Sequence, residues 1–195
     1  MANSDTPKGF KPFKYQNGAP YDGKARVVYA PSGTSDRIGL YDLVTPSGTA
    51  DTLGHYLTVT RSAAAEEDIL GSVIGFGYTP YMAVDFDDLG ANYRVAADPM
   101  YLWIADDPAL LYLAQDDAGA TGTAGDVGSN CEITVANCST TTGLSAMELA
   151  FGGLTTGAAQ IRIEGLFDDP NNVLGDNATW VCRINEHAYS LRTGA

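Results

Sequence analysis

The sequence predicts a mainly β protein with a compact, sandwich- or barrel-like body. Short apolar runs alternate with clusters of Gly, Pro, Asn and Asp over most of the chain, a pattern typical of strands separated by turns. The 22 glycines among 195 residues fit many such turns. Helical periodicity is scarce, so we expect at most one or two helical turns, near residues 63–68 and 123–128.

The stretch from Asp68 to Phe76 organises the middle of the chain. Its apolar residues are interrupted by Gly71 and Gly75. A glycine inside a strand weakens it and marks a bulge, a bend or the close approach of another backbone. We therefore expect a buried, bent strand here, which closes a β unit formed with strands near 39–44 and 56–60.

Further strands are expected within a body that spans residues 24–195. Each apolar run is bounded by turn residues, and the runs cover 24–30, 93–97, 100–105, 110–115, 131–135, 160–166 and 179–185. The runs 100–105 and 110–115 are joined by a short segment that contains Pro108, and this arrangement predicts a hairpin.

Residues 1–23 are predicted to form an extended N-terminal arm. Prolines and glycines prevent a regular helix, while four aromatic residues supply apolar anchors: Phe10, Phe13, Tyr15 and Tyr21. Such a segment can lie across a partner surface, with its aromatic side chains in pockets, or it can pack back on its own body. If it serves a partner, its deletion should leave a folded body.

Charge is distributed unevenly along the chain. The net charge is −13, but residues 1–37 carry six of the eleven basic residues and sum to +3, while the remaining residues sum to −16 and contain no lysine. An acidic body argues against nucleic-acid binding, because a phosphate-tracking groove needs clustered Lys and Arg. It indicates either a well-solvated surface or a body that avoids self-association while a basic arm docks on a partner.

The sequence predicts neither a membrane segment nor secretion. No apolar run reaches the ~18 residues of a membrane helix, and no signal peptide is visible at the start. We therefore expect a soluble protein made in a cytoplasm. In that reducing environment the odd number of cysteines, without metal-ligand spacing, predicts buried free thiols at Cys131, Cys138 and Cys182.

No residue pattern points to catalysis, a metal or a cofactor. The nucleophile-elbow, P-loop, dinucleotide-binding and zinc-protease motifs are all missing, and the spacing of a calcium loop is absent. Glu186 and His187 have no nucleophile beside them in sequence and are interpreted as a surface or interface contact. Four acidic doublets invite comparison with glycosidase carboxylates but fit ordinary turn chemistry better: Asp87-Asp88, Asp106-Asp107, Asp116-Asp117 and Asp168-Asp169.

Three stretches resemble structural proteins from the head-gene clusters of tailed phages. They are the opening from Lys11 to Tyr21, the order from Tyr41 through Gly48-Thr49-Ala50 to Phe76, and the ending from Gly175 to His187. This resemblance implies a capsid decoration, or cement, protein with a mainly β body of the β-tulip type. Members of that family are commonly trimeric and bind the outside of the expanded head where major capsid subunits meet.

The resemblance leads to a set of functional expectations. We expect a non-enzymatic virion protein on the outer capsid surface, without cofactors, that binds the major capsid protein and forms a homo-oligomer, a trimer before a dimer. The alternative is a β-sandwich head fibre or carbohydrate-binding adhesin module, although Trp103 and Trp180 lie in strand-like runs and are interpreted as core. The expected capsid-binding residues are Lys8, Phe10, Lys11, Phe13, Lys14 and Tyr15.

Overall fold

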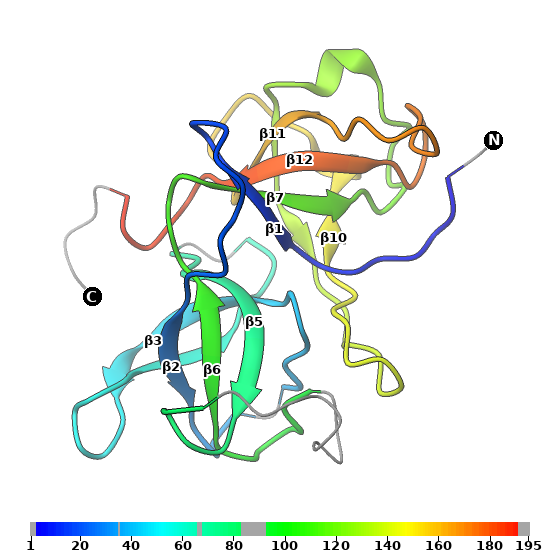
Figure 1. Ribbon diagram of the computed structural model, residues 1–195. Helices are drawn as coiled ribbons and strands as arrows, with labels where there is room; N and C mark the ends of the chain where they lie inside the picture. The colour runs from blue at the N-terminus through cyan, green and yellow to red at the C-terminus, as the bar shows by residue number, and fades with distance from the viewer. Residues whose placement is uncertain (1–2, 35, 66–67, 83–92, 191–195) are drawn as a thin grey trace.

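The protein is mainly β, as the sequence predicts, and its strands form two units. The computed structural model describes residues 3–34, 36–65, 68–82 and 93–190. Among these residues there is no α-helix, only two single 3-10 turns, η2 (Ala124–Asp126) and η3 (Phe151–Gly153). In Figure 1 one unit, with β2, β3, β5 and β6, occupies the lower half, and the other, with β1, β7, β11 and β12, the upper half.

The lower unit is a closed five-stranded barrel. Its strands are β2 (Arg26–Ala30), β3 (Leu43–Ala50), β4 (Leu57–Arg61), β5 (Gly71–Gly77) and β6 (Met100–Ala105), in the spatial order β2-β4-β3-β5-β6. Alternate residues point inward because successive side chains of a strand face opposite sides. Val28, Val73 and Leu102 are examples of the fully buried barrel core.

The strand β5 confirms the interpretation of the glycine-rich central stretch. Its register with β6 shifts between Val73 and Gly75, which is the irregularity that an interior glycine predicts. At Gly71 an added Cβ would lie 2.2 Å from the carbonyl oxygen of Ala105. Only glycine allows this close approach of two backbones.

The upper unit is a five-stranded sheet with a small two-stranded sheet beside it. Its strands are β1 (Lys11–Tyr15), β7 (Leu110–Gln115), β8 (Asn130–Cys131), β11 (Ile161–Leu166) and β12 (Thr179–Ile184), in the order β1-β7-β12-β11-β8. The small sheet pairs β9 (Ile133–Thr134) with β10 (Glu148–Leu149). One side of the main sheet carries Tyr112, Trp180 and Ile163 into a second buried core.

The predicted hairpin between residues 100–105 and 110–115 does not form. The strand β6 pairs with β2 and β5 in the barrel, whereas β7 pairs with β1 and β12 in the sheet. The short connection through Asp106 and Pro108 therefore carries the chain from one unit to the other. The expected strand at 93–97 is also wrong, because Arg94 makes only an isolated bridge with Ile38.

The N-terminal segment is part of the upper unit, which corrects the predicted division into an arm and a body. Residues 11–15 form the edge strand β1, and Phe10 is fully buried in the core of the sheet. Ahead of them, the side-chain amide of Gln115 donates to Ser4 O at 2.8 Å and accepts from Thr6 N at 2.9 Å. Burial of Phe10 and completion of the sheet edge stabilise this docked state.

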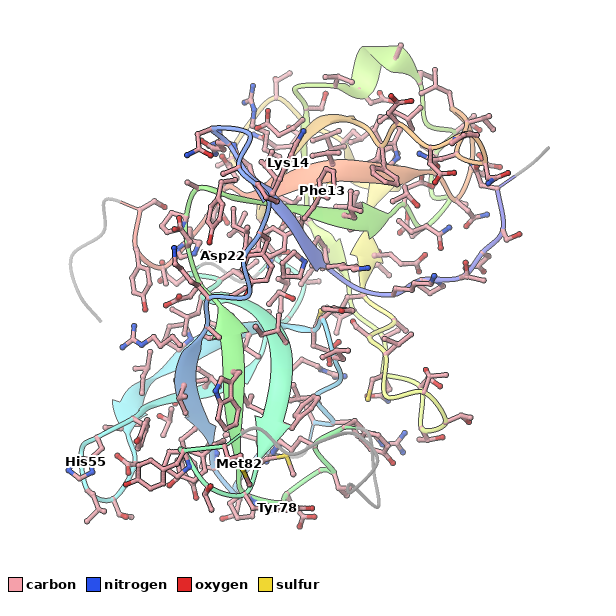
Figure 2. The ribbon with its side chains drawn as sticks, in the orientation of Figure 1. Phe13, Lys14, Asp22, His55, Tyr78 and Met82 are labelled. Carbon is pink, nitrogen blue, oxygen red and sulfur yellow. The ribbon has the colours of Figure 1, made fainter. Side chains whose placement is uncertain are left out.

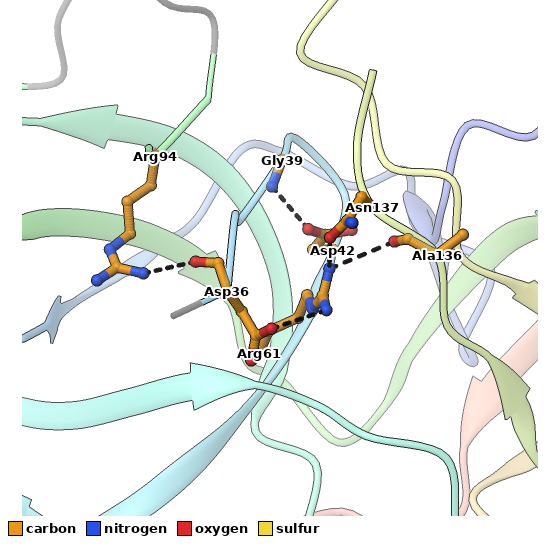
Figure 3. A network of polar contacts seen from close by, with 7 residues as sticks. All are labelled: Asp36, Gly39, Asp42, Arg61, Arg94, Ala136 and Asn137. Atoms are coloured by element: carbon orange, nitrogen blue, oxygen red, sulfur yellow. Dashed lines mark hydrogen bonds and ion pairs between the residues drawn. The ribbon is translucent and has the colours of Figure 1, made fainter. Parts of the chain in front are cut away.

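A polar network connects barrel residues to the segment that follows β9 (Figure 3). Arg61 forms an ion pair with Asp36 at 3.0 Å and donates to Asn137 Oδ1 at 2.9 Å. Arg94 is buried and donates to three backbone carbonyls, including Asp36 O at 2.8 Å. Both arginines are used for structure, so neither contributes a free cation to the surface.

Asp42, which accepts a hydrogen bond from Gly39 N (Figure 3), should make folding stability depend on pH. Desolvation by burial raises its pKa from 3.8 to about 6, partly offset by the hydrogen bond from Gly39 N at 2.6 Å. The ionised form is thus disfavoured in the folded state, and stability falls as pH rises from about 4 to 6. Asp42→Asn should remove this fall and stabilise the protein at pH 7 by up to about 3 kcal/mol.

Urea unfolding of the wild type and Asp42→Asn between pH 4 and pH 7 measures this effect. The difference between the two proteins isolates Asp42 from other titrating groups, and Asp168→Asn, an exposed acid, is the matched control. A difference that stays constant over the whole range would mean that Asp42 does not titrate there.

Candidate functional site

The side of the five-stranded sheet that faces away from the core carries a row of basic residues. Tyr112, Trp180 and Ile163 point inward, so their strand neighbours point outward. Following the pairing across the sheet, Lys14 lies opposite Leu111, and Arg183 lies opposite Arg162. We call this surface the outer face; it comprises Lys11, Phe13, Lys14, Leu111, Leu113, Arg162, Glu164, Phe167, Val181 and Arg183.

An irregularity in β1 places two of the lysines on the same side. The register of β1 against β7 shifts between Pro12 and Lys14, so that Lys11 pairs with Leu113 and Lys14 with Leu111. In a regular strand, residues three apart point to opposite faces. The bulge changes the side of the sheet to which Lys14 points. Lys11 and Lys14 therefore lie on the same face and make the edge strand basic.

Phe13, at the bulge, supplies an apolar contact on the outer face. Its ring packs edge-on against Phe167 with 5.5 Å between centroids, and the Lys14 ammonium lies 5.2 Å from its centroid. Figure 2 labels Phe13 and Lys14 together on the sheet unit, well apart from His55, Tyr78 and Met82 on the barrel. The aromatic ring is half-buried, so part of its surface remains available to a partner.

Most other described cations are neutralised or buried, which makes the outer face the main basic surface. Lys24 pairs with Asp22 at 2.9 Å, and Arg26 lies 3.8 Å from Asp106. Among the described residues no carboxylate lies within ion-pair distance of the amino groups of Lys8, Lys11 or Lys14. Of the remaining described cations, Arg37 and Arg94 lie elsewhere without an ion pair, and Arg94 is buried and bonded to backbone carbonyls. The outer face is thus a positive surface on a strongly acidic protein.

Two hollows lie on this face. The first has a volume of about 410 Å³ and lies beneath the docked N-terminal segment, with Lys8, Lys11, Leu113 and Phe167 in its lining. The second is more open, with a volume of about 520 Å³, and is lined by Gln16, Leu111, Arg162, Glu164 and Arg183. Each hollow contains two cations and one acid, Asp169 in the first and Glu164 in the second, together with at least one apolar side chain. This excess of cations suits an acidic partner that also buries apolar surface.

The structure separates the predicted capsid-binding residues into three groups. Lys11, Phe13 and Lys14 lie on the outer face, and Lys8 lies at its edge. Tyr15 packs beside Tyr21 against the core of the sheet. Phe10 is fully buried in that core, so its predicted role as an anchor on another protein is wrong.

Sequence reasoning missed Arg162 and Arg183 as candidate site residues. The alternation of Gln160-Ile161-Arg162-Ile163-Glu164 indicates a half-buried strand with Arg162 on its polar side. It does not indicate that this polar side continues the surface of Lys11 and Lys14, which requires the strand order. The strand β1 near the start of the chain and the strands β11 and β12 near its end contribute the cations.

One acidic doublet, Asp116-Asp117, serves the fold. Asp116 is fully buried and accepts hydrogen bonds from Ala178 N at 2.8 Å and the Trp180 indole at 2.9 Å. Asp117 accepts from Phe151 N and Thr134 Oγ1. The doublet Asp87-Asp88 lies outside the described residues. Within the described part of the chain no cluster of His, Cys, Asp and Glu could hold a metal ion.

The burial of side chains tests two further interpretations of the sequence, those of the cysteines and of His187. All three cysteines are buried and free, as predicted, and desolvation raises the pKa of Cys131 to about 12. His187 is buried rather than a surface contact, and desolvation lowers its pKa to about 4. The thiols and the imidazole are therefore neutral at pH 7, as apolar surroundings favour.

A second exposed surface lies on the barrel. Tyr81 is 90% exposed, and Leu53, Tyr78 and Met82 are also highly exposed. Nearby, the rings of Tyr29 and Tyr56 both pack against Tyr101, with centroid distances of 5.2 and 5.3 Å. Trp180 is in the core as predicted, whereas Trp103 is only half-buried. Aromatic and Met side chains at this exposure are typical of contact surfaces.

Comparison of the chain with protein families, with curated proteins and with solved structures finds no significant match. Among the described residues there is also no helix long and apolar enough to cross a bilayer. The residues of the outer face, together with the sequence resemblance to decoration proteins, are therefore the basis for assigning a function.

Proposed function

We propose that this chain is a non-enzymatic structural protein of a phage head, which binds the outer capsid surface between major capsid subunits and stabilises the shell. The observation that carries the proposal is the outer face, where Lys11, Lys14, Arg162 and Arg183 gather on one side of an otherwise acidic protein. The sequence resemblance to decoration proteins indicates the major capsid protein as the partner, and the outer face supplies a surface for binding it.

The chemistry of the outer face suits a shell that presents acidic and apolar groups. Cations steer the protein toward an acidic surface and fix its orientation, while Phe13 and its neighbours bury apolar area on contact. The strong negative charge of the remaining surface opposes association at random sites. In this proposal the protein is located on the virion and its copies form a homo-oligomer, a trimer before a dimer, because closed symmetry suits capsid junctions.

Substitutions on the outer face should weaken attachment to heads by different amounts. Aromatic anchors typically cost ~2 kcal/mol or more when truncated, whereas exposed ion pairs are worth ~1 kcal/mol or less and weaken with salt. We expect Phe13→Ala to lower affinity by at least about tenfold. Lys11→Ala should lower it only a few-fold, with the loss disappearing at high salt. Co-sedimentation with purified empty heads that lack this protein measures both effects.

Matched controls separate the outer face from general effects. Tyr78→Ala truncates an exposed aromatic residue on the barrel, and Lys24→Ala removes a cation that pairs with Asp22. Neither should change head binding, and thermal unfolding should show that all four variants are folded. Equal losses in Phe13→Ala and Tyr78→Ala, or no binding of the wild type at all, would contradict the proposal.

The exposed aromatic residues of the barrel favour one second candidate, a carbohydrate-binding head fibre or adhesin module. Rings such as Tyr78 and Tyr81 present flat apolar faces together with hydroxyl groups, a combination suited to partly apolar, partly polar ligands. A glycan array probed with the same variants discriminates the two functions. Glycan binding that Tyr81→Ala abolishes, without any head binding, would favour the adhesin.

A further inference from the structure

Two arginines of the outer face lie directly opposite each other on neighbouring antiparallel strands. Arg162 of β11 pairs in register with Arg183 of β12, an arrangement in which like charges destabilise a sheet. Glu164 lies between them, with Oε1 2.8 Å from Arg183 Nε and 3.6 Å from Arg162 Nε. Two guanidinium groups and one carboxylate leave a net charge of +1 at this point.

The contacts with Glu164 use the Nε atoms and leave the outer ends of both guanidinium groups available. Within the described part of the chain, the terminal nitrogens of Arg162 and Arg183 have no hydrogen-bond partner. The two arginine side chains border the open hollow of about 520 Å³, with the nearly buried side chain of Leu111 and the side chain of Gln16 also in its lining. The arginine side chains are only 39% and 33% exposed, so packing restricts their positions.

We propose that this hollow is a seat for a carboxylate side chain of an acidic protein segment. The inference rests on the proposed function, in which the segment belongs to the shell, and it names the chemistry of the contact. The planar guanidinium group matches a carboxylate with two parallel hydrogen bonds. Gln16 adds an amide donor at the rim, and the small exposed part of Leu111 adds one apolar contact.

Glu164 acts in this arrangement as an internal substitute for the partner's carboxylate. It lies where β11 shifts register against β12, between Ile163 and Gly165, and it is exposed. An exposed ion pair contributes little, so displacement of Glu164 by an incoming acid costs little. Glu164 keeps the two arginines from repelling each other while the seat is empty.

The surroundings favour a protein segment over a free oxyanion or a nucleic acid. The hollow is open to solvent, so a small anion that makes no other contact would be screened and weakly held. A nucleic acid needs a series of cations along its phosphates, whereas this seat carries a net charge of +1 on a strongly acidic body. A protein segment adds contacts with Gln16 and with the small exposed part of Leu111.

The test uses the full chain and a five-residue probe peptide, acetyl-Gly-Leu-Glu-Leu-Gly-amide. Arginine Nε–Hε signals in nitrogen-15 NMR spectra report on the seat, and Arg61, which pairs with Asp36, is an internal reference. We expect the peptide to shift the signals of Arg162 and Arg183 but not of Arg61. The same peptide with Gln in place of Glu should shift neither.

Substitutions then distinguish bidentate hydrogen bonding by the arginines from attraction by charge alone. Arg183→Gln should weaken peptide binding by about tenfold. Arg183→Lys keeps the charge but loses the planar pair of N–H donors, so it should recover less than half of that loss. Glu164→Gln should tighten binding a few-fold. Lys24→Gln and Asp98→Asn change the net charge by the same amounts away from the outer face and should have no effect, and thermal unfolding checks that every variant is folded.

The outcomes distinguish the seat from the proposed function. Equal shifts with the Glu and Gln peptides, or arginine shifts with sodium sulfate but not with the Glu peptide at equal ionic strength, would overturn the seat. Heads that bind Arg183→Gln as tightly as the wild type, while Phe13→Ala binds weakly, would also overturn it and leave the docking proposal standing. Arginine-dependent peptide binding without head binding would support the seat and contradict the proposed function.

Discussion

Phe10→Ala should destabilise the protein by about 3–5 kcal/mol, the range for truncating a fully buried phenylalanine. The side chain of Phe10 lies in the core of the sheet unit, and its backbone is held on both sides. Phe10 N donates to Tyr41 O at 2.9 Å, and Phe10 O accepts from Ser72 Oγ at 2.6 Å. Because Tyr41 and Ser72 belong to the barrel part of the chain, Phe10 also ties the two units together.

Deletion of residues 1–23 extends this prediction. The deletion removes Phe10 together with the edge strand β1, and it leaves β7 as an exposed edge that carries Leu111 and Leu113. An unprotected apolar edge promotes aggregation, so we expect the shortened chain to lose cooperative unfolding and to precipitate. This is the reverse of the sequence-based expectation that a folded body remains.

Urea unfolding of the full chain measures the effect of Phe10→Ala. Phe13→Ala is the matched control, since Phe13 is only half-buried on the outer face, and it should cost less than half as much. If Phe10→Ala and Phe13→Ala had equal effects, or if the chain without residues 1–23 unfolded at the wild-type midpoint, the N-terminal segment would not be part of the sheet unit.

The fold class and most strands follow from local patterns, but the arrangement of strands does not. The alternation in 160–166 and 179–185 reports which residues face a core, and both runs form strands. The connection through Asp106 and Pro108 resembles a hairpin turn in sequence. It joins two different units, because β6 pairs with β2 and β5 whereas β7 pairs with β1 and β12. These long-range pairings are more stable than a local pairing of β6 with β7.

Only part of the candidate site could be predicted from the sequence, for the same reason. Lys11, Phe13 and Lys14 attract notice because they concentrate charge and aromatic rings in an acidic chain. Their shared face depends on the bulge in β1, and no residue in Lys11-Pro12-Phe13-Lys14 marks that bulge with a glycine. Arg162 and Arg183 join them only through the strand order, which no local pattern encodes.

Asp116→Ala should destabilise the protein by more than about 4 kcal/mol, because it leaves several buried donors without an acceptor. The carboxylate of Asp116 accepts from Asn177 N, Ala178 N and the Trp180 indole at 2.8, 2.8 and 2.9 Å. It thereby fixes the chain where it enters β12. Asn177 has a positive φ of 56°, a conformation that Asn tolerates better than most residues, and the carboxylate holds it there.

Urea unfolding followed by far-UV circular dichroism measures this loss, because this signal is present in every variant, including one without Trp180. Trp180→Phe removes the indole donor and retains most of the apolar volume, so it should cost only about 1–3 kcal/mol. Asp168→Ala, which alters an exposed acid of another doublet, should change stability by less than about 0.5 kcal/mol. Similar small effects of Asp116→Ala and Asp168→Ala would mean that the acidic doublets are equivalent surface turns and that the sheet does not depend on a buried carboxylate.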